Sequence, residues 1–197
     1  MGGMSKVFTA AAHRIADDRA LQSGIIAVDG PSGAGKSTFA DSLVSRLTEL
    51  GRHCLLIRTD DYATWDEPAS WWPELERHVL APYRRSHDVS YRPRVWVDGV
   101  PHPGPERRLP WAPLLILEGV TSARRAIASR LDRALWIEGP DPVERLARSV
   151  ARDGEDQRDH LAAWQRFEDG WFAVDDTRSR CEILKPGCDV PTAPGRG

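Results

Sequence analysis

The apolar residues of this chain gather in short continuous runs that are separated by longer stretches with helical spacing. Five runs, each bounded by glycine, proline or charged residues, predict buried strands at residues 25–29, 54–58, 114–117, 134–137 and 181–184. The stretches around them predict helices at residues 6–21, 36–50, 72–81, 121–130, 142–152 and 157–170. Because strands and helices alternate, the pattern favours an α/β fold in three layers, with a mainly parallel central sheet flanked by helices.

Residues 30–37 follow the first predicted strand and read GPSGAGKS, the Gly-x-x-x-x-Gly-Lys-Ser pattern of a phosphate-binding loop. Small residues let the backbone wrap a phosphate closely enough for successive N–H groups to reach its oxygens. Lys36 is expected to reach the β- and γ-phosphates, and the Ser37 hydroxyl to bind Mg²⁺. The predicted nucleotide-binding residues are Gly30, Pro31, Ser32, Gly33, Ala34, Gly35, Lys36, Ser37 and Thr38. The sequence therefore predicts a nucleoside-triphosphate site on a P-loop NTPase fold.

Acidic residues follow two of the other predicted strands. Asp60 and Asp61 come after residues 54–58, and Glu118 comes after residues 114–117. Since α/β proteins bind ligands at the carboxyl ends of their strands, we expect these acids near the γ-phosphate. There Asp60 can accept a proton from an attacking hydroxyl group, and Glu118 can hold Mg²⁺ directly or through water. The structural alternative is that Asp60 or Asp61 caps the next helix and that Glu118 is a turn residue.

Composition and charge narrow the class of protein. The chain has 197 residues and a formal net charge of -2, which suits one domain and offers no basic field for nucleic acid. Its widely spaced Cys54, Cys181 and Cys188 predict neither a disulfide framework nor a zinc site. With no apolar run of about 18 residues and no export signal, we expect a cytoplasmic protein without a membrane partner. A regulatory GTPase would need an Asn-Lys-x-Asp motif, and the chain contains no asparagine.

Four motifs carry a resemblance to a known family: GPSGAGKST at residues 30–38, TDDY at 59–62, LEG at 117–119 and RLARSVARD at 145–153. They resemble those of the uridine kinase-like P-loop kinases, which have phosphoribulokinase and bacterial pantothenate kinase as relatives. The resemblance implies ATP- and Mg²⁺-dependent transfer of the γ-phosphate to a hydroxyl group of a small molecule such as a nucleoside. It also implies that Asp60 is the catalytic base and that Arg148 and Arg152 belong to a lid over the phosphates.

The chain departs from that family around the acceptor. Ser149 stands where uridine kinases usually carry a second adjacent arginine, and the lid segment at residues 154–158 is shorter. Arg94-Val95-Trp96 stands where the family has a Tyr-Asp-Phe stretch against its nucleoside. Residues 181–187, CEILKPG, resemble the family's final strand and adenine-side loop. The resemblance therefore supports the phosphate-transfer half of the site, and the nucleoside half is not supported.

Residues 63–112 are rich in Trp, Pro and Arg and are expected to form the acceptor-binding insertion, with a hairpin at residues 91–102. Its aromatic planes, which include Trp65 and Tyr91, could stack on a base or cover a sugar face. The candidate acceptor residues are Asp61, Tyr62, Trp71, Trp72, Arg94 and Trp96. Alternatively, Trp71 and Trp72 are packing residues. The insertion also holds four arginines that either bind a phosphate on the acceptor, as in a monophosphate kinase, or form a solvated basic face: Arg84, Arg85, Arg92 and Arg94.

We expect one domain over residues 1–185, with a lid at about 145–158 and a disordered tail at 186–197. Arg145, Arg148 and Arg152 share one helical face by their spacing. This face meets either the triphosphate or acids of the next helix such as Glu155, Asp159 or Glu168. A nucleotide-binding ATPase or regulatory protein without a small-molecule acceptor is the alternative function.

Overall fold

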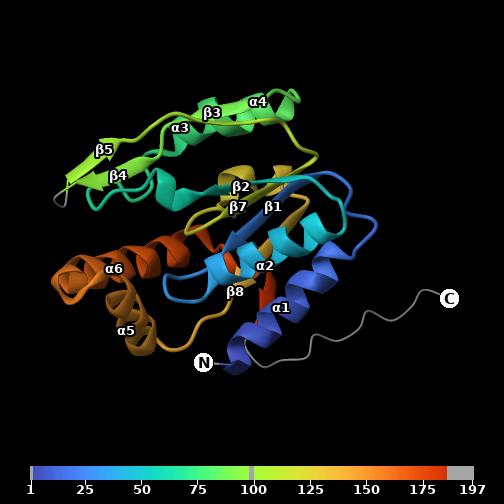
Figure 1. Cartoon of the computed structure of the whole chain (residues 1–197). Helices are drawn as coiled ribbons and strands as arrows, with labels where there is room; N and C mark the ends of the chain where they lie inside the picture. Colours follow the sequence, from blue (N-terminus) through green and yellow to red (C-terminus); the bar gives the residue numbers. More distant parts are fainter. Residues whose placement is uncertain (1, 98–99, 186–197) are drawn as a thin grey trace.

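The computed structural model describes residues 2–97 and 100–185, with side chains from residue 9 onward, and it contains a central sheet of five parallel strands (Figure 1). The strand order is β2-β7-β1-β8-β9. The strands are β1 (Gly24–Asp29), β2 (Cys54–Arg58), β7 (Leu114–Glu118), β8 (Arg133–Ile137) and β9 (Glu182–Leu184). All five agree with the apolar runs of the sequence. Glu118 is in register with both Val28 and Arg58, so β1, β2 and β7 end at the same edge of the sheet.

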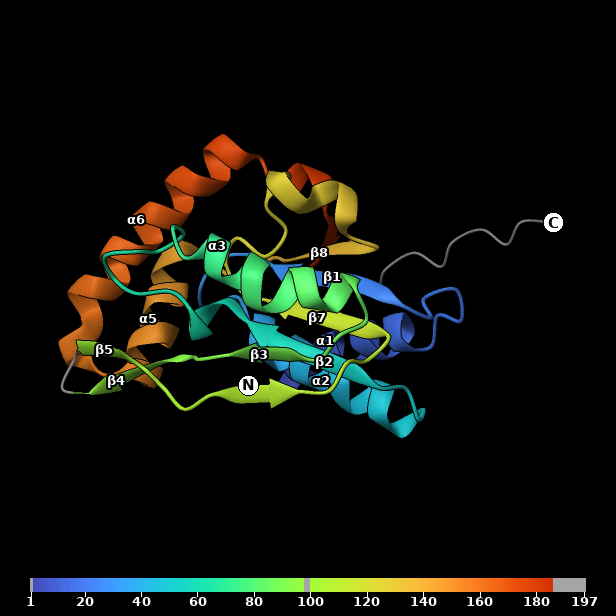
Figure 2. The same ribbon diagram turned by 90° about the horizontal axis from the view of Figure 1, so that it is seen from above.

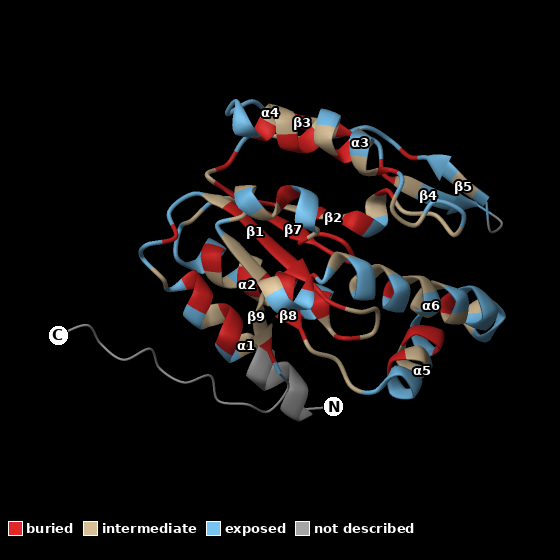
Figure 3. Ribbon diagram, turned by 180° about the vertical axis from the view of Figure 1, so that it is seen from behind, coloured by how far each residue is buried: buried red, intermediate tan, exposed pale blue. Residues whose placement is uncertain are grey.

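Alternation along the central strands divides the core between the two faces of the sheet. Ile26 of β1 and Ile116 of β7 pack with α1 (Gly2–Ala16) and α2 (Lys36–Glu49) on one face. Ile25 and Leu115, one residue earlier on each strand, belong to a second cluster on the opposite face. Figure 3 shows this buried layer between the outer elements. Successive side chains of a strand point to opposite faces, which is why continuous apolar runs produce a sheet covered on both sides.

The insertion covers the second face of the sheet. It holds a continuous helical segment made of α3 (Trp72–Leu75), a π-helical turn (Glu76–Leu80) and α4 (Ala81–Arg84), so the predicted helix at 72–81 is confirmed and continues to Arg84. The predicted hairpin is also present, as β4 (Arg94–Val97) paired with β5 (Val100–Pro103). A second antiparallel pair, β3 (Val89–Tyr91) with β6 (Arg107–Leu109), gave no sequence signal because each strand has only three residues.

Helices α5 (Pro142–Asp153) and α6 (Arg158–Asp175) lie beyond the edge where β1 and β7 end, on the same side as the β4–β5 hairpin (Figure 2). Asp141 caps α5, because its carboxylate accepts hydrogen bonds from the N–H groups of Val143 and Glu144. A short 3₁₀ turn, Glu155–Gln157, joins the two helices. The α6 helix continues five residues past the predicted end at residue 170, to Asp175.

The predicted helix at 121–130 is wrong. Residues 119–124 form a turn, and only Arg125–Arg130 are helical, as a 3₁₀ helix. Thr121 has a φ of 72°, outside the helical region, and the N–H groups of Thr121 and Ala123 donate to the side chain of Asp29. The N–H groups of Thr121 and Ala123 thus bind a side chain of β1 instead of forming helical hydrogen bonds. Similarly, α1 ends at Ala16 instead of residue 21.

The expectations about membrane spans, cysteines and the C-terminal tail can be compared with the structure only over the described residues. Among the described helices, none is long and apolar enough to cross a membrane. Cys54 and Cys181 are free thiols, and Cys188 lies outside the described residues. The expected disordered tail at 186–197 and the adenine-side loop at 186–187 also lie outside them.

Candidate active site

The predicted phosphate-binding loop, called the phosphate loop below, spans residues 30–35, and Lys36, Ser37 and Thr38 form the first turn of α2. Gly30, Gly33 and Gly35 have φ values of 136°, 76° and 101°, a region that glycine occupies without strain. A Cβ atom on Gly30 would lie 2.5 Å from the carbonyl oxygen of Ile137, and one on Gly33 would lie 2.6 Å from that of Arg145. The loop is therefore packed against β8 and α5 so closely that larger residues do not fit.

Lys36 is folded over this loop. Its side chain is largely buried, and Nζ donates a hydrogen bond to the carbonyl oxygen of Pro31 at 3.0 Å. The ammonium group and the N-terminal end of α2 thus face the space that the loop encloses. Both attract anions, so the arrangement suits the phosphates of a nucleotide.

Ser37 and Glu118 meet beside the loop. The Ser37 hydroxyl donates to Glu118 Oε1 at 3.3 Å, and Arg58 Nε lies 3.2 Å from Glu118 Oε2. Glu118 is only 3% exposed, and burial raises its pKa, with nearby Asp60 adding to the rise and Lys36 and Arg58 opposing it. A hydroxyl and a carboxylate oxygen side by side are ligands of the kind Mg²⁺ prefers, so Ser37 and Glu118 could hold this ion.

The two adjacent aspartates differ in their surroundings. Asp61 accepts a hydrogen bond from the Tyr91 hydroxyl at 2.8 Å and pairs with Arg107 at 2.9 Å. Asp60 is exposed, and within residues 2–97 and 100–185 no side chain forms a hydrogen bond or ion pair with it. Neither carboxylate caps a helix in this part of the chain. Asp60 is therefore the one of the two that is available to a ligand.

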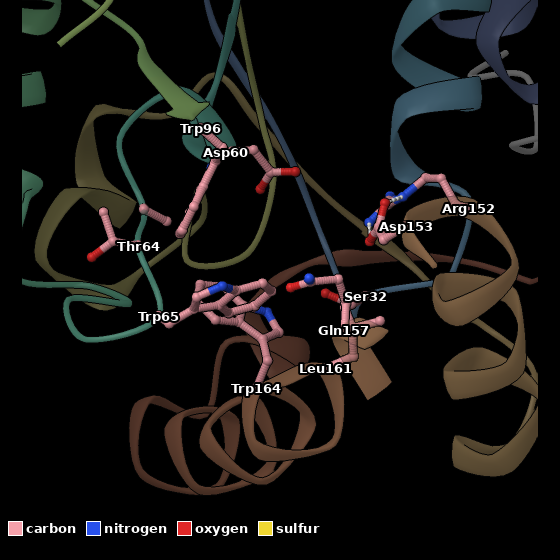
Figure 4. Close-up of a pocket in the computed structure, with 11 residues that line it drawn as sticks. Ser32, Asp60, Thr64, Trp65, Trp96, Arg152, Asp153, Gln157, Leu161 and Trp164 are labelled. Carbon is pink, nitrogen blue, oxygen red and sulfur yellow. Dashed lines mark hydrogen bonds and ion pairs between the residues drawn. The ribbon is translucent and has the colours of Figure 1, made fainter. Parts of the chain in front are cut away.

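A cavity of about 450 Å³ opens between the phosphate loop, the turn that carries Asp60, the β4 strand and the α5–α6 connection (Figure 4). Its lining residues are Ser32, Asp60, Ala63, Thr64, Trp65, Trp96, Arg152, Asp153, Gln157, Leu161 and Trp164. In Figure 4, Trp65 and Trp164 lie together on one side, and Arg152 and Asp153 lie across from them. The cavity thus has an aromatic wall and a charged wall.

Trp65 is the centre of the aromatic wall. Its ring centroid lies 5.6 Å from that of Trp96, 5.9 Å from that of Trp164 and 5.2 Å from that of His160. Trp96 was a predicted acceptor residue, whereas Trp164 and His160 come from α6 and were not predicted. The only sequence signal for Trp164 is its place on the helix that follows the lid motif.

Other predicted acceptor residues pack into the core or form ion pairs. Tyr62 is 1% exposed and Trp71 is 4% exposed, and their rings stack at 5.5 Å. Trp72 is partly buried against the same cluster, with the Arg124 guanidinium 4.6 Å from its ring centre. Arg94 pairs with Glu74 at 2.8 Å. None of these four residues lines the cavity.

The three lid arginines have three different environments. Arg152 lines the cavity and pairs with Asp153 at 2.6 Å. Arg145 is buried, with Nη1 3.9 Å from Glu168 Oε2, which is the pairing with the next helix that the sequence left open. Arg148 forms an ion pair with Glu144 on its own helix and does not line the cavity. Of the two predicted catalytic arginines, the structure brings Arg152 to Asp60 and the phosphate loop, and it does not bring Arg148 there.

Asp29 was not predicted as a site residue, yet its side chain connects two segments of the site. It is fully buried at the end of β1 and accepts hydrogen bonds from the N–H groups of Gly30 at 2.7 Å, Thr121 at 3.2 Å and Ala123 at 2.8 Å. Burial raises the pKa of Asp29 to about 7, against the effect of these N–H groups and of Lys36. Asp29 therefore joins the start of the phosphate loop to the turn after β7.

We expect the contribution of Asp29 to the free energy of unfolding to fall as pH rises from its ordinary pKa of 3.8 to its folded pKa of about 7. Its pKa is higher in the folded chain than in the unfolded chain, so the folded state binds more protons in this range and loses stability as pH rises. The loss can reach about 1.4 kcal/mol per pH unit and levels off above the folded pKa. Urea unfolding at pH 5, 6, 7 and 8 should show that, as pH rises, the free energy of unfolding of wild type falls relative to that of Asp29→Asn. A difference that does not depend on pH would contradict this assignment.

No family model matches the sequence, and no curated protein sequence matches it. Solved structures do match the fold. They include a possible uridine kinase from Bacillus stearothermophilus (TM-score 0.63, 16% identity, 90% of this chain and 96% of that chain). They also include a candidate fructose transport system kinase from Silicibacter sp. TM1040 (TM-score 0.53, 18% identity, 90% and 97%). A third is D-glycerate 3-kinase from Cryptococcus neoformans (TM-score 0.57, 14% identity, 85% and 88%). At these identities the likeness concerns the fold alone, and it confirms the predicted three-layer α/β architecture with a parallel central sheet flanked by helices.

Proposed function

We propose that the protein is a kinase that uses ATP and Mg²⁺ to phosphorylate a hydroxyl group of a small, uncharged molecule with a flat or apolar face. The observation that carries this proposal is the cavity itself. It is lined by Asp60, by Ser32 of the phosphate loop and by the aromatic wall. Similar folds in proteins described as kinases of small molecules support it, as does the spacing of the loop residues.

Each residue has a defined part in the reaction. The acceptor oxygen attacks the γ-phosphorus, its proton passes to Asp60, and the bond from phosphorus to the β–γ bridging oxygen breaks, which gives ADP and a phosphate ester. Lys36 offsets charge on the β- and γ-phosphates. Ser37 and Glu118 would hold Mg²⁺, which supplies further neutralisation of the phosphate charge when bound. Arg152, which lines the cavity, would neutralise charge on the oxygens of the transferring group.

None of the four arginines predicted in the insertion, Arg85 included, lines the cavity, which favours an acceptor without a phosphate. Arg84 pairs with Glu76 and Arg94 pairs with Glu74, both at 2.8 Å. Arg92 donates to the carbonyl oxygen of Gly104 at 3.1 Å. Arg152 is the only arginine among the described cavity residues, and the phosphotransfer step itself needs it. A monophosphate kinase is therefore the less favoured reading.

An acceptor screen tests the proposal. ATP consumption with Mg²⁺ is measured with nucleosides, sugars and polyols as uncharged acceptors, and with their phosphorylated forms and hydroxy acids as charged ones. We expect turnover to rise with at least one uncharged compound and to stay at the basal rate with the matching monophosphates. A rate that no acceptor changes would favour the alternative of a nucleotide-binding ATPase or regulatory protein. Because the substrates would be intracellular metabolites, the proposal includes a cytoplasmic location.

Arg152→Ala should lower kcat by about 10³-fold while ATP binding changes much less, because a guanidinium group on the transferring oxygens acts mainly in the transition state. Arg148→Ala is the matched control, since Arg148 pairs with Glu144 away from the cavity. Steady-state kinetics and thermal melting of both variants make the comparison. A marked drop in the melting temperature of Arg152→Ala with kcat intact would show that this arginine is structural.

A further inference from the structure

Glu168 is an acidic residue whose side chain is completely buried next to the phosphate loop. It lies on α6 with 0% exposure, and its carboxyl oxygens accept hydrogen bonds from the Ser32 N–H at 3.0 and 3.2 Å and from the Ser32 hydroxyl. The Trp164 indole N–H donates to the same carboxyl group at 2.6 Å. Burying such a group costs free energy unless it is well bonded, and here both oxygens are used.

These contacts connect two parts of the site that are far apart in the sequence. Trp164 and Glu168 are four residues apart on α6, so they share one face of the helix. The Trp164 ring is part of the aromatic wall, and Ser32 belongs to the phosphate loop and lines the same cavity. Arg145 approaches Glu168 from α5, and its backbone packs against Gly33 of the loop. Among the residues that the structure describes, Glu168 is therefore the one carboxyl group that contacts the loop, the aromatic wall and the lid helix together.

We propose that Glu168 is a positioning residue that couples the phosphate loop to the acceptor wall through Ser32 and Trp164. A triphosphate on the loop places negative charge beside the amides that include Ser32 N–H, and the hydrogen bonds to Glu168 must adjust to it. Trp164 shares that carboxyl group, so its indole ring responds as well. By reciprocity, an acceptor that fixes the Trp164 ring favours the loop geometry that binds the triphosphate. This inference rests on the nucleotide-binding part of the proposed function.

The test uses the full chain and a non-hydrolysable probe, adenylyl imidodiphosphate with Mg²⁺. Calorimetry gives the Kd, and tryptophan fluorescence gives the response of the aromatic wall. We expect Trp164→Phe, which keeps a ring but removes the N–H donor, to remove most of the fluorescence change while Kd stays within about threefold. Glu168→Gln should remove the same part of the signal.

Two control variants have no contact with the cavity. Trp111→Phe removes an indole N–H that donates to the carbonyl oxygen of Tyr83, and Glu49→Gln removes an exposed acid at the end of α2. Both should leave the Trp164-dependent signal unchanged. If Glu168→Gln does not fold, Ser32→Ala takes its place, since it removes one donor to Glu168, and it should lower the signal.

The outcomes separate the two proposals. A full response in Glu168→Gln, or in Ser32→Ala if that replaces it, overturns the coupling. Calorimetric binding by wild type without a Trp164-dependent signal also overturns the coupling alone. If wild type shows no calorimetric binding, the proposed nucleotide function fails and the coupling fails with it.

Discussion

Replacing Lys36 with alanine is expected to lower the rate of phosphotransfer by about 10²- to 10³-fold, as the loss of one preorganised donor does in other enzymes. Lys36 is held over the phosphate loop by its hydrogen bond to Pro31, so its ammonium group is already in place before the charge develops. Without it, the negative charge that builds up between the β- and γ-phosphates has no cation on that side. The kinetics are measured with the acceptor that the screen identifies, or as ATP hydrolysis if none is found.

Arg46→Ala is the matched control for Lys36→Ala. Arg46 is also on α2, but it pairs with Asp17 and Glu49 near the other end of the helix. Its loss removes one positive charge from the same element without touching the loop, so activity should change little. If Lys36→Ala keeps more than a third of the wild-type activity, the phosphate-loop assignment is wrong.

Asp60→Asn is expected to lower kcat by about 10²-fold or more while nucleotide binding persists. The amide has nearly the shape of the carboxylate but cannot take the proton of the attacking hydroxyl group. Asp60 lines the cavity, and within the described residues it has no bonding partner that would hold it in another role. Binding of adenylyl imidodiphosphate and turnover with acceptor, measured on the same preparation, should therefore separate.

Asp61→Asn provides the sharpest comparison, because it makes the same change one residue away. Asp61 is bound to Tyr91 and Arg107, so its substitution should loosen the insertion and affect kcat less than Asp60→Asn does. Thermal melting reports the first effect and steady-state kinetics the second. If Asp61→Asn has the larger loss of kcat, Asp61 is the base and the Asp60 assignment fails.

The sequence was sufficient for the features that depend on neighbours along the chain. The phosphate loop needs glycines, a lysine and a serine at fixed spacing, and the positive φ angles of Gly30, Gly33 and Gly35 follow from that spacing. The five buried strands are visible as short apolar runs. Asp60 and Glu118 could be placed near the loop because Asp60 follows a strand and Glu118 ends one, and parallel strands end at a common edge.

Only the tertiary structure decided which side chains face the cavity. The insertion has little periodicity and contains four of the tryptophans discussed above, Trp65, Trp71, Trp72 and Trp96. Trp71 packs in the core beneath the sheet, whereas Trp65 and Trp96 line the cavity. Trp164 reaches the same wall from α6, about a hundred residues later in the chain. No local pattern can report such a meeting, because it depends on how α6 is placed against the insertion.

The partners of the two buried acids, Asp29 and Glu168, were also decided only by the tertiary structure. Asp29 lies next to the glycine loop and Glu168 lies in the middle of a helix, and nothing around them in the sequence indicates their partners. Asp29 is bonded by amides of residues 121 and 123, which the strand order brings beside β1, and Glu168 is bonded by Ser32 of the loop. A buried carboxyl group is tolerated only where donors converge on it, and convergence is a property of the folded chain. The sequence by itself therefore determined the loop that is predicted to bind phosphate, and the folded structure decided which residues surround and position that loop.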